Sequence, residues 1–221
     1  MRFRLPGAAL AAAVLCAFLS ADAGVLIPVT LKKKPDPSIL SLEEMQVAIT
    51  ADHRLVRVRI QQIYASHVGR VLEGTYLFSF PPGASLSDFA IWDGVTRIPG
   101  VILEKQKAAE IYRDLVWQAI DPGLLQMGGQ DETSEIPADF FTVKVAPIPP
   151  YGYKRMELEY QQRLEVQDGK VSFRLPLKSQ LYDPLTVRRL SLDLEVAEGR
   201  PMRDFSLTAA APGGEAGGAV P

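Results

Sequence analysis

The sequence LEGTYLFSF (residues 72–80) is dense in aromatic and β-prone residues, and Pro81-Pro82-Gly83 stops it. Such side chains favour a pleated, half-buried strand, and proline lacks the N–H group that a sheet ladder requires. The stretch therefore predicts a strand that carries aromatic side chains into a core. Residues 86–92 predict the next strand, Asp93-Gly94 is typical of a tight turn between antiparallel strands, and residues 98–103 predict the returning partner.

The same two-residue period recurs on both sides of this stretch. From about Glu44 the pattern alternates, and Val56, Val58 and Ile60 are separated by polar residues, which indicates a strand with one buried face. Further strands are predicted at residues 140–145, 153–166, 171–175 and 190–196, and the sequence QDGK (residues 167–170) predicts a hairpin turn.

One segment has a helical period instead. Between Glu104 and about Ala119, apolar residues recur at the spacing of one helix face, namely at Ala108, Ile111, Tyr112, Leu115 and Ala119. Because strands and helices do not alternate along the chain, a doubly wound parallel sheet is not expected. We predict a mainly β fold, an antiparallel β-sandwich or barrel-like sheet with one amphipathic α-helix packed on it.

The N-terminus has the pattern of a secretory signal peptide. Arg2 and Arg4 precede an apolar run at residues 8–19, and Ala21-Asp22-Ala23 places small residues at the positions that a signal peptidase recognises. The run is shorter than the ~20 residues that a membrane-spanning helix needs. We expect a signal peptide at residues 1–23 and an exported protein, in the periplasm, on the cell surface or outside the cell. An uncleaved membrane anchor is the alternative.

Three segments follow the signal peptide. Residues 24–41 combine apolar residues, prolines and the run Lys32-Lys33-Lys34, and they predict a solvated leader. Residues 42–207 contain the predicted strands and form the expected domain. Residues 208–221 are rich in Gly, Ala and Pro, a composition typical of a flexible linker or tail. Either a further domain normally follows this linker, or the tail is a remnant.

Composition argues against several classes of function. The chain has 24 basic and 26 acidic side chains and a formal net charge of −2, which gives no basic excess for binding nucleic acid. Cys16, the one cysteine, lies within the signal peptide. The mature chain therefore has no thiol for a disulfide or a zinc site. We expect no nucleic-acid partner and no cofactor, and contact with a membrane only through an uncleaved signal.

The polar residues contain no recognisable catalytic or metal-binding motif. His53 and His67 are expected at or near opposite ends of one strand, too far apart to share a metal ion. The chain lacks a Gly-x-Ser-x-Gly nucleophile motif and a phosphate-binding glycine loop. Candidate carboxylates are numerous: Glu73, Asp88, Asp93, Glu104, Asp121, Asp131, Glu132, Glu135 and Asp139. The acidic run at residues 130–135 is typical of a solvated loop, and a surface calcium site there stays an alternative.

Two tryptophans complete the set of candidate residues. Trp92, beside the predicted turn, and Trp117, near the end of the predicted helix, are either anchors for a partner or packing at the edge of the core. Packing is the commoner role for such positions. We therefore assign no catalytic, cofactor-binding or metal-binding residue, and we expect a protein that is not an enzyme.

One ordered set of segments is similar to a known family. The set comprises residues 72–81, 84–92 and 100–105, then Ala108, Ala109 and Tyr112, residues 121–125, Phe140-Phe141, residues 147–150 and Leu158-Glu159-Tyr160. In order and spacing it resembles the VIT domain, the module shared by vault poly(ADP-ribose) polymerase and the inter-alpha-trypsin inhibitor heavy chains. The resemblance covers about residues 42–178.

The resemblance implies a non-enzymatic domain with no catalytic or binding residues to carry over. Members of the family typically precede a von Willebrand type A domain, whose Asp-x-Ser-x-Ser motif is absent from this chain. We expect an exported, non-catalytic module for protein–protein interaction or structural support, normally joined to such a domain. The alternatives are a secreted β-sandwich that binds a small ligand or carbohydrate, with Trp92 or Trp117 as a stacking platform, and a hydrolase that uses scattered carboxylates.

Overall fold

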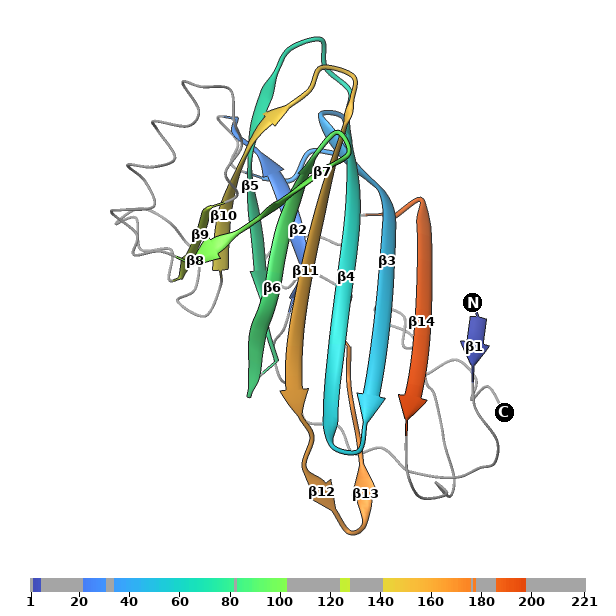
Figure 1. Cartoon of the computed structure of the whole chain (residues 1–221). Helices are drawn as coiled ribbons and strands as arrows, with labels where there is room; N and C mark the ends of the chain where they lie inside the picture. Colours follow the sequence, from blue (N-terminus) through green and yellow to red (C-terminus); the bar gives the residue numbers. More distant parts are fainter. Residues whose placement is uncertain are drawn as a thin grey trace.

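The computed structural model describes residues 2–4, 22–30, 34–81, 83–102, 124–127, 141–175, 177 and 186–197. Their strands are β1 (Arg2–Arg4), β2 (Asp22–Pro28), β3 (Leu40–Asp52), β4 (Leu55–Ser66), β5 (Leu72–Ser79), β6 (Ala84–Asp93), β7 (Thr96–Pro99), β8 (Val101–Ile102), β9 (Leu124–Met127), β10 (Phe141–Ile148), β11 (Tyr153–Arg163), β12 (Val166–Gln167), β13 (Lys170–Val171) and β14 (Arg189–Ala197). Figure 1 shows two layers of strands, with the β12–β13 hairpin extending beyond one end.

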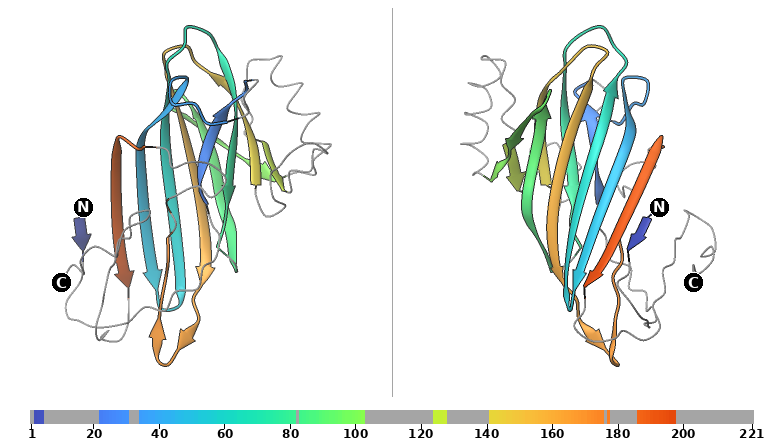
Figure 2. Two further views of the ribbon diagram at one scale, coloured as in Figure 1. Left: turned by 180° about the vertical axis from the view of Figure 1, so that it is seen from behind. Right: turned by 45° about the vertical axis from the view of Figure 1, so that its right-hand side comes forward.

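The larger layer is a seven-stranded sheet in the order β1-β14-β3-β4-β11-β6-β7, and the smaller is a five-stranded sheet in the order β2-β5-β10-β9-β8. Most neighbours are antiparallel, but β14 runs parallel to β3, β1 to β14 and β8 to β9. The prediction of a mainly β fold is confirmed. The wholly antiparallel arrangement and the barrel-like alternative are wrong, because both sheets are mixed and neither closes within the described residues (Figure 2).

The amphipathic helix predicted at residues 104–119 lies outside the described residues. Within the part of the chain that the structure describes, no residue is helical, so the helix packed on the sheet is not supported. None of these residues forms a helix with the length and apolar character needed to cross a membrane.

The core lies between the two sheets and contains the aromatic side chains of the stretch at residues 72–80. Phe78 of β5 is 0% exposed. Its ring centroid lies between 5.2 and 6.0 Å from those of Tyr76, Phe80, Phe89 and Phe141. Aromatic pairs at such separations add to the stability that burial alone provides. The predicted aromatic core strand is confirmed.

The two-residue period of β4 and β11 fixes which side chains face the core. The two strands pair from Leu55↔Arg163 to Tyr153↔Ala65 with no shift in register. In β4, Val56, Val58 and Ile60 are buried, and the polar residues between them point to the other side of the sheet. The alternation seen in the sequence therefore produces one apolar face and one polar face.

Part of the segment predicted as a solvated leader, residues 24–41, belongs to the sandwich. Strand β2 pairs antiparallel with β5, and Val25, Leu26 and Ile27 are buried. Gly24 has a φ of +95°, and a Cβ atom there would lie 2.0 Å from the hydroxyl oxygen of Tyr76. Only glycine tolerates this combination of backbone angle and close approach. The packed part of the chain therefore begins before residue 42.

Both predicted tight turns are present. Asp93-Gly94 ends β6 and leads into β7, which pairs antiparallel with it. In the β12–β13 hairpin, Asp168 and Gly169 have φ values of +51° and +74°, as a two-residue hairpin loop requires. The strand predicted at residues 171–175 is much shorter, because β13 ends at Val171.

Candidate functional site

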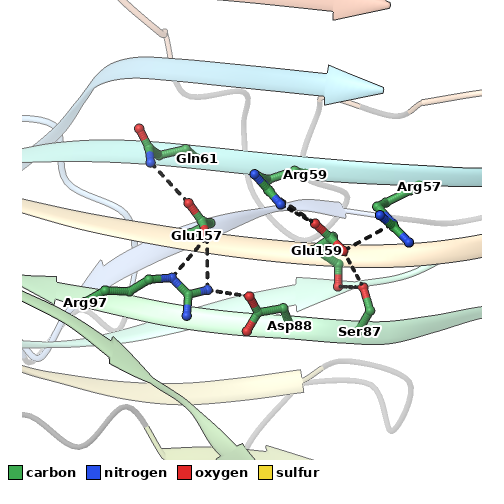
Figure 3. Close-up of polar contacts among 8 residues, drawn as sticks. All are labelled: Arg57, Arg59, Gln61, Ser87, Asp88, Arg97, Glu157 and Glu159. Carbon is green, nitrogen blue, oxygen red and sulfur yellow. Dashed lines mark hydrogen bonds and ion pairs between the residues drawn. The ribbon is translucent and has the colours of Figure 1, made fainter. Parts of the chain in front are cut away.

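The side chains of the seven-stranded sheet that point away from the core carry a cross-strand network of charges (Figure 3). We call this surface the outer face and define it by Glu44 of β3, Arg57, Arg59, Gln61 and Ile63 of β4, Ser87, Asp88 and Trp92 of β6, Arg97 of β7, and Tyr153, Arg155, Glu157 and Glu159 of β11. Because β11 lies between β4 and β6, its carboxylates reach partners on both sides.

Glu159 is an enclosed carboxylate near the centre of the outer face, and the residue is 8% exposed. It lies directly opposite Arg59, which donates from Nε and Nη2 to Oε2 at 3.1 and 2.9 Å. The other oxygen, Oε1, accepts a hydrogen bond from Ser87 Oγ at 3.1 Å and lies 3.5 Å from Nε of Arg57. Both oxygens of Glu159 therefore have partners on neighbouring strands.

Glu157 has an equivalent set of partners two residues earlier on β11. Gln61 donates from Nε2 to Oε2 at 3.3 Å, and Arg97 donates from Nε and Nη2 to Oε1 at 3.3 and 3.0 Å. The Arg97 guanidinium also contacts Asp88. Burial alone would lower the pKa of Arg97, but the hydrogen bond to Glu157 and the charge of Asp88 outweigh it and raise that pKa.

This network is suited to holding strands together. A catalytic carboxylate must present an oxygen within hydrogen-bond reach of a substrate. In Glu157 and Glu159, each carboxylate oxygen instead contacts a guanidinium, amide or hydroxyl group of a neighbouring strand. Cross-strand pairs of opposite charge contribute about 0.2–1 kcal/mol each to the stability of a sheet.

At one end of the outer face, two aromatic side chains, Trp92 and Tyr153, lie among charged ones. A groove of about 700 Å³ is lined there by Glu43, Glu44, Ile63, Trp92, Gly94, Tyr153, Arg155, Arg188 and Arg189. The guanidinium carbon of Arg155 lies 4.7 Å from the centroid of the Trp92 ring, within the range of a cation–π contact. Tyr153 is 68% exposed. We call the groove formed around these three side chains the aromatic groove.

A bulge in β3 builds one rim of the aromatic groove. The β3–β4 register shifts between Leu42 and Glu44, so Glu43 is the extra residue. Arg188 donates from Nη1 to Oε2 of Glu43 at 3.0 Å, and Arg189 donates to Glu44 at 3.5 Å. The hydrogen bond from Ser41, followed by that from Arg188, lowers the pKa of the Glu43 carboxyl below its ordinary value.

We expect Glu43→Gln to reduce stability at neutral pH and to cost less as the pH falls. Because the folded pKa is lowered, ionised Glu43 stabilises the folded state above the ordinary value of 4.5, and this contribution disappears as the pH falls through the folded pKa. Since Arg188 is well exposed, the loss of unfolding free energy at about pH 7 should be below about 1 kcal/mol. Urea unfolding at about pH 7 and about pH 3 measures both values. An equal loss at both pH values would contradict the assignment.

The structure does not bring the two histidines together. His53 lies in the β3–β4 turn and contacts Asp52 at 2.5 Å, whereas His67 follows β4 and contacts Ser41 Oγ at 2.7 Å. They therefore flank opposite ends of β4, as their spacing predicts. Within the described ranges, no group of three or more His, Cys, Asp or Glu residues could hold a metal ion. Trp117 and the acidic run at residues 130–135 lie outside those ranges.

Residues 42–160, more than half of the chain, match the Vault protein inter-alpha-trypsin (VIT) domain family. The chain belongs to the VIT family. The match runs from β3 into β11 and therefore includes both carboxylates of the network on the outer face. The family predicted from the ordered sequence segments is confirmed.

The VIT chain is also similar to a longer curated protein. It is 30% identical over 177 residues to inter alpha-trypsin inhibitor, heavy chain 4, of Mus musculus. This alignment covers 78% of the VIT chain but 17% of the heavy chain, so the two correspond over a small part of the longer protein.

Two solved structures are similar to part of this chain at low identity. One is a candidate nutrient-binding protein from Legionella pneumophila (TM-score 0.37, 8% identity, 65% of this chain and 43% of that chain). The other is an M1 zinc metallopeptidase from Deinococcus radiodurans (TM-score 0.30, 12% identity, 58% of this chain and 22% of that chain). Both scores are below 0.5, so neither similarity bears on the function of the VIT chain.

The sequence analysis identified single residues of the outer face of this VIT domain but not the network of charges that joins them. Trp92 and Asp88 were candidates, and Asp88 is now seen beside Arg97. Glu157 was not among the candidate carboxylates, and Glu159 appeared only as a family position. The available signal was the alternation of charged with apolar residues in residues 153–160, which places both glutamates on one face.

Proposed function

We propose that this chain is an exported, non-catalytic VIT module that binds a protein partner through the outer face of its seven-stranded sheet. The aromatic groove is the observation that carries the proposal. Trp, Tyr and Arg are the residues most enriched at binding hot spots, and here Trp92, Tyr153 and Arg155 meet on two paired strands. Such strands hold the side chains in fixed positions, which lowers the entropy cost of binding.

The paired charges support a binding role over a catalytic one. The central carboxylates of the outer face are occupied by arginines, so they contribute a rigid polar platform beside the groove. An interface with an apolar centre and a polar surround is typical of protein–protein contacts. The exported location is supported by the signal pattern of residues 1–23.

The proposal includes attachment to a von Willebrand type A domain, as the VIT family implies. The chain contains a Gly/Ala/Pro-rich segment at residues 208–221 that is suited to linking domains. In that arrangement the VIT module supplies structural support and a protein-binding surface, and the second domain supplies the ion-dependent contact.

Binding of carbohydrate is a weaker explanation of the same groove. A sugar would stack on an open aromatic face, but the Arg155 guanidinium already lies over the Trp92 ring. A sugar would first have to displace this cation–π contact, which costs about 0.5–1 kcal/mol at an exposed site.

The test compares proteins captured by the wild-type chain with those captured by two variants. Tyr153→Ala combined with Arg155→Ala removes two groove side chains, and Leu55→Ala removes a 44% exposed side chain at the other end of β4. We expect quantitative affinity enrichment from the producing organism to yield a defined partner with wild type and Leu55→Ala. The groove variant should retain about a tenth of it or less, as for a hot spot worth at least 1.4 kcal/mol.

Thermal melts of the three proteins show whether each remains folded. Equal capture by a folded groove variant would contradict the proposed surface. Substrate turnover by the purified chain, abolished by a single carboxylate substitution, would contradict the non-catalytic role.

A further inference from the structure

Strand β14 is the second strand from one border of the seven-stranded sheet, beside the three-residue strand β1, and its core side is only partly buried. Its residues Leu190, Leu192 and Leu194 lie on the same side of the sheet as Met45, Val47 and Ile49 of β3. The β3 residues are buried, but Leu190 is 48% exposed, and Leu192 and Leu194 are only partly buried. The apolar side of β14 is therefore less well buried than that of the neighbouring strand β3.

The opposite side of β14 carries two exposed carboxylates. Asp193 and Glu195 are exposed and lie opposite Ala48 and Thr50 of β3. Among the described residues, neither carboxylate has an ion pair or a side-chain hydrogen bond. This differs from Arg189 on the same strand, which donates to Glu44.

A short strand of the chain itself lies along this border. β1 pairs parallel with β14, with Arg2 opposite Asp193, Phe3 opposite Leu194 and Arg4 opposite Glu195 (Figures 1 and 2). The register thus places basic positions opposite acidic ones and an apolar position opposite an apolar one. Residues 2–4 lie within the predicted signal peptide, so its removal would leave the backbone N–H and C=O groups of β14 open on this side.

We propose that the open edge of β14 binds an extended segment of a protein partner. This segment has alternating basic and apolar residues and is added as a strand parallel to β14. Residues 2–4 occupy the same edge until the signal peptide is removed. Addition of a strand to an exposed sheet edge is a general mode of peptide recognition, in which backbone hydrogen bonds give affinity and alternate side chains give specificity. Strand β14 contributes Arg189 to the aromatic groove, but Leu192, Asp193, Leu194 and Glu195 are not among the residues that line it.

The negative charges of β14 favour a partner segment with basic residues. Basic residues on the outer face would pair with Asp193 and Glu195, and apolar residues on the core side would cover Leu192 and Leu194. A second copy of β14 would bring the same two carboxylates close to each other, and like charges on neighbouring strands are destabilising. A basic segment is therefore favoured over self-association.

The probe for this proposal is a fluorescent eight-residue peptide that alternates arginine with phenylalanine or valine. Fluorescence anisotropy measures the binding of this peptide to two forms of the protein: the exported chain, from which the signal peptide has been removed, and the unprocessed chain, which retains it. We expect binding to the exported chain to weaken about tenfold in Asp193→Lys/Glu195→Lys, because two attractive pairs become repulsive. A peptide with glutamate in place of arginine should show the reverse preference.

Two controls separate edge binding from general electrostatics and from unfolding. Glu165→Lys changes an exposed carboxylate away from β14 and should leave peptide binding unchanged. In the unprocessed chain, Arg2→Glu/Arg4→Glu should increase peptide binding, because the edge is released. Equal weakening by Glu165→Lys and by Asp193→Lys/Glu195→Lys would overturn the docking site. So would a glutamate peptide that does not prefer Asp193→Lys/Glu195→Lys over the wild-type edge. An unprocessed chain that binds as tightly as the exported one would overturn the role of residues 2–4.

Discussion

Phe78→Ala is expected to lower the free energy of unfolding by about 3–5 kcal/mol, the usual cost of removing a fully buried phenylalanine. Phe78 is 0% exposed and packs against aromatic rings from three other positions in the core as well as against Phe80. The surrounding side chains come from both sheets, so they cannot collapse into the cavity without moving a strand. Urea unfolding followed by fluorescence and circular dichroism measures the loss.

Two matched variants make this result specific. Phe78→Leu keeps most of the apolar volume and should cost clearly less than Phe78→Ala. Val95→Ala shortens a side chain that is 93% exposed in the β6–β7 turn and should be neutral within about 0.5 kcal/mol. A loss below about 1 kcal/mol for Phe78→Ala would mean that the two sheets do not share this aromatic core.

Glu159→Lys is expected to cost about 2–3 kcal/mol, because it removes an enclosed carboxylate and adds a cation beside two arginines. The Glu159 side chain is 11% exposed, whereas those of Arg57 and Arg59 are 54% and 57% exposed. The arginines can turn toward solvent, so the cost stays below that of a fully buried pair. The same variant should become more sensitive to low salt, since repulsion between its cations is screened by ions.

Glu159→Gln is the control for this prediction. It retains the shape of the side chain and one acceptor oxygen, but it replaces the other oxygen with an NH2 group and removes the charge. It adds no cation beside the arginines, so it should cost less than Glu159→Lys. Glu165→Lys makes the same change of net charge at an exposed position and should be close to neutral. If Glu159→Lys were as stable as Glu165→Lys, the network on the outer face would not contribute to the fold.

Local patterns predicted most of the longer strands in the described part of the chain but not the way they assemble. The aromatic stretch at residues 72–80 and the turn at Asp93-Gly94 are each decided by a few neighbouring residues, and both are present. Pairing of β14 with β3 joins segments more than a hundred residues apart, and nothing in residues 190–196 specifies a parallel neighbour. Strand β2 was missed because the prolines and lysines around it outweighed its short apolar run.

The same holds for the candidate site: local patterns predicted single residues, but not which residues of other strands lie beside them. The alternation of β4 predicts that Arg59 lies on a polar face, but its partner Glu159 is 100 residues away and is brought opposite only by the β4–β11 register. Trp92 was a candidate anchor from its residue type, whereas the groove around it also needs Tyr153 and Arg155 from a different strand. A site made by cross-strand neighbours becomes visible once the strand order is known.

Site-specific photo-crosslinking from the aromatic groove tests the central claim most directly. A photoreactive phenylalanine analogue replaces Tyr153 in the groove or, as a control, Val166, which is 47% exposed in β12 at the other end of β11. Both proteins are produced in the native organism, irradiated, and examined by mass spectrometry. We predict a discrete crosslinked protein partner from position 153 and none from position 166. The same partner from both positions, or a partner from position 166 alone, would contradict the assignment of the outer face as the binding surface.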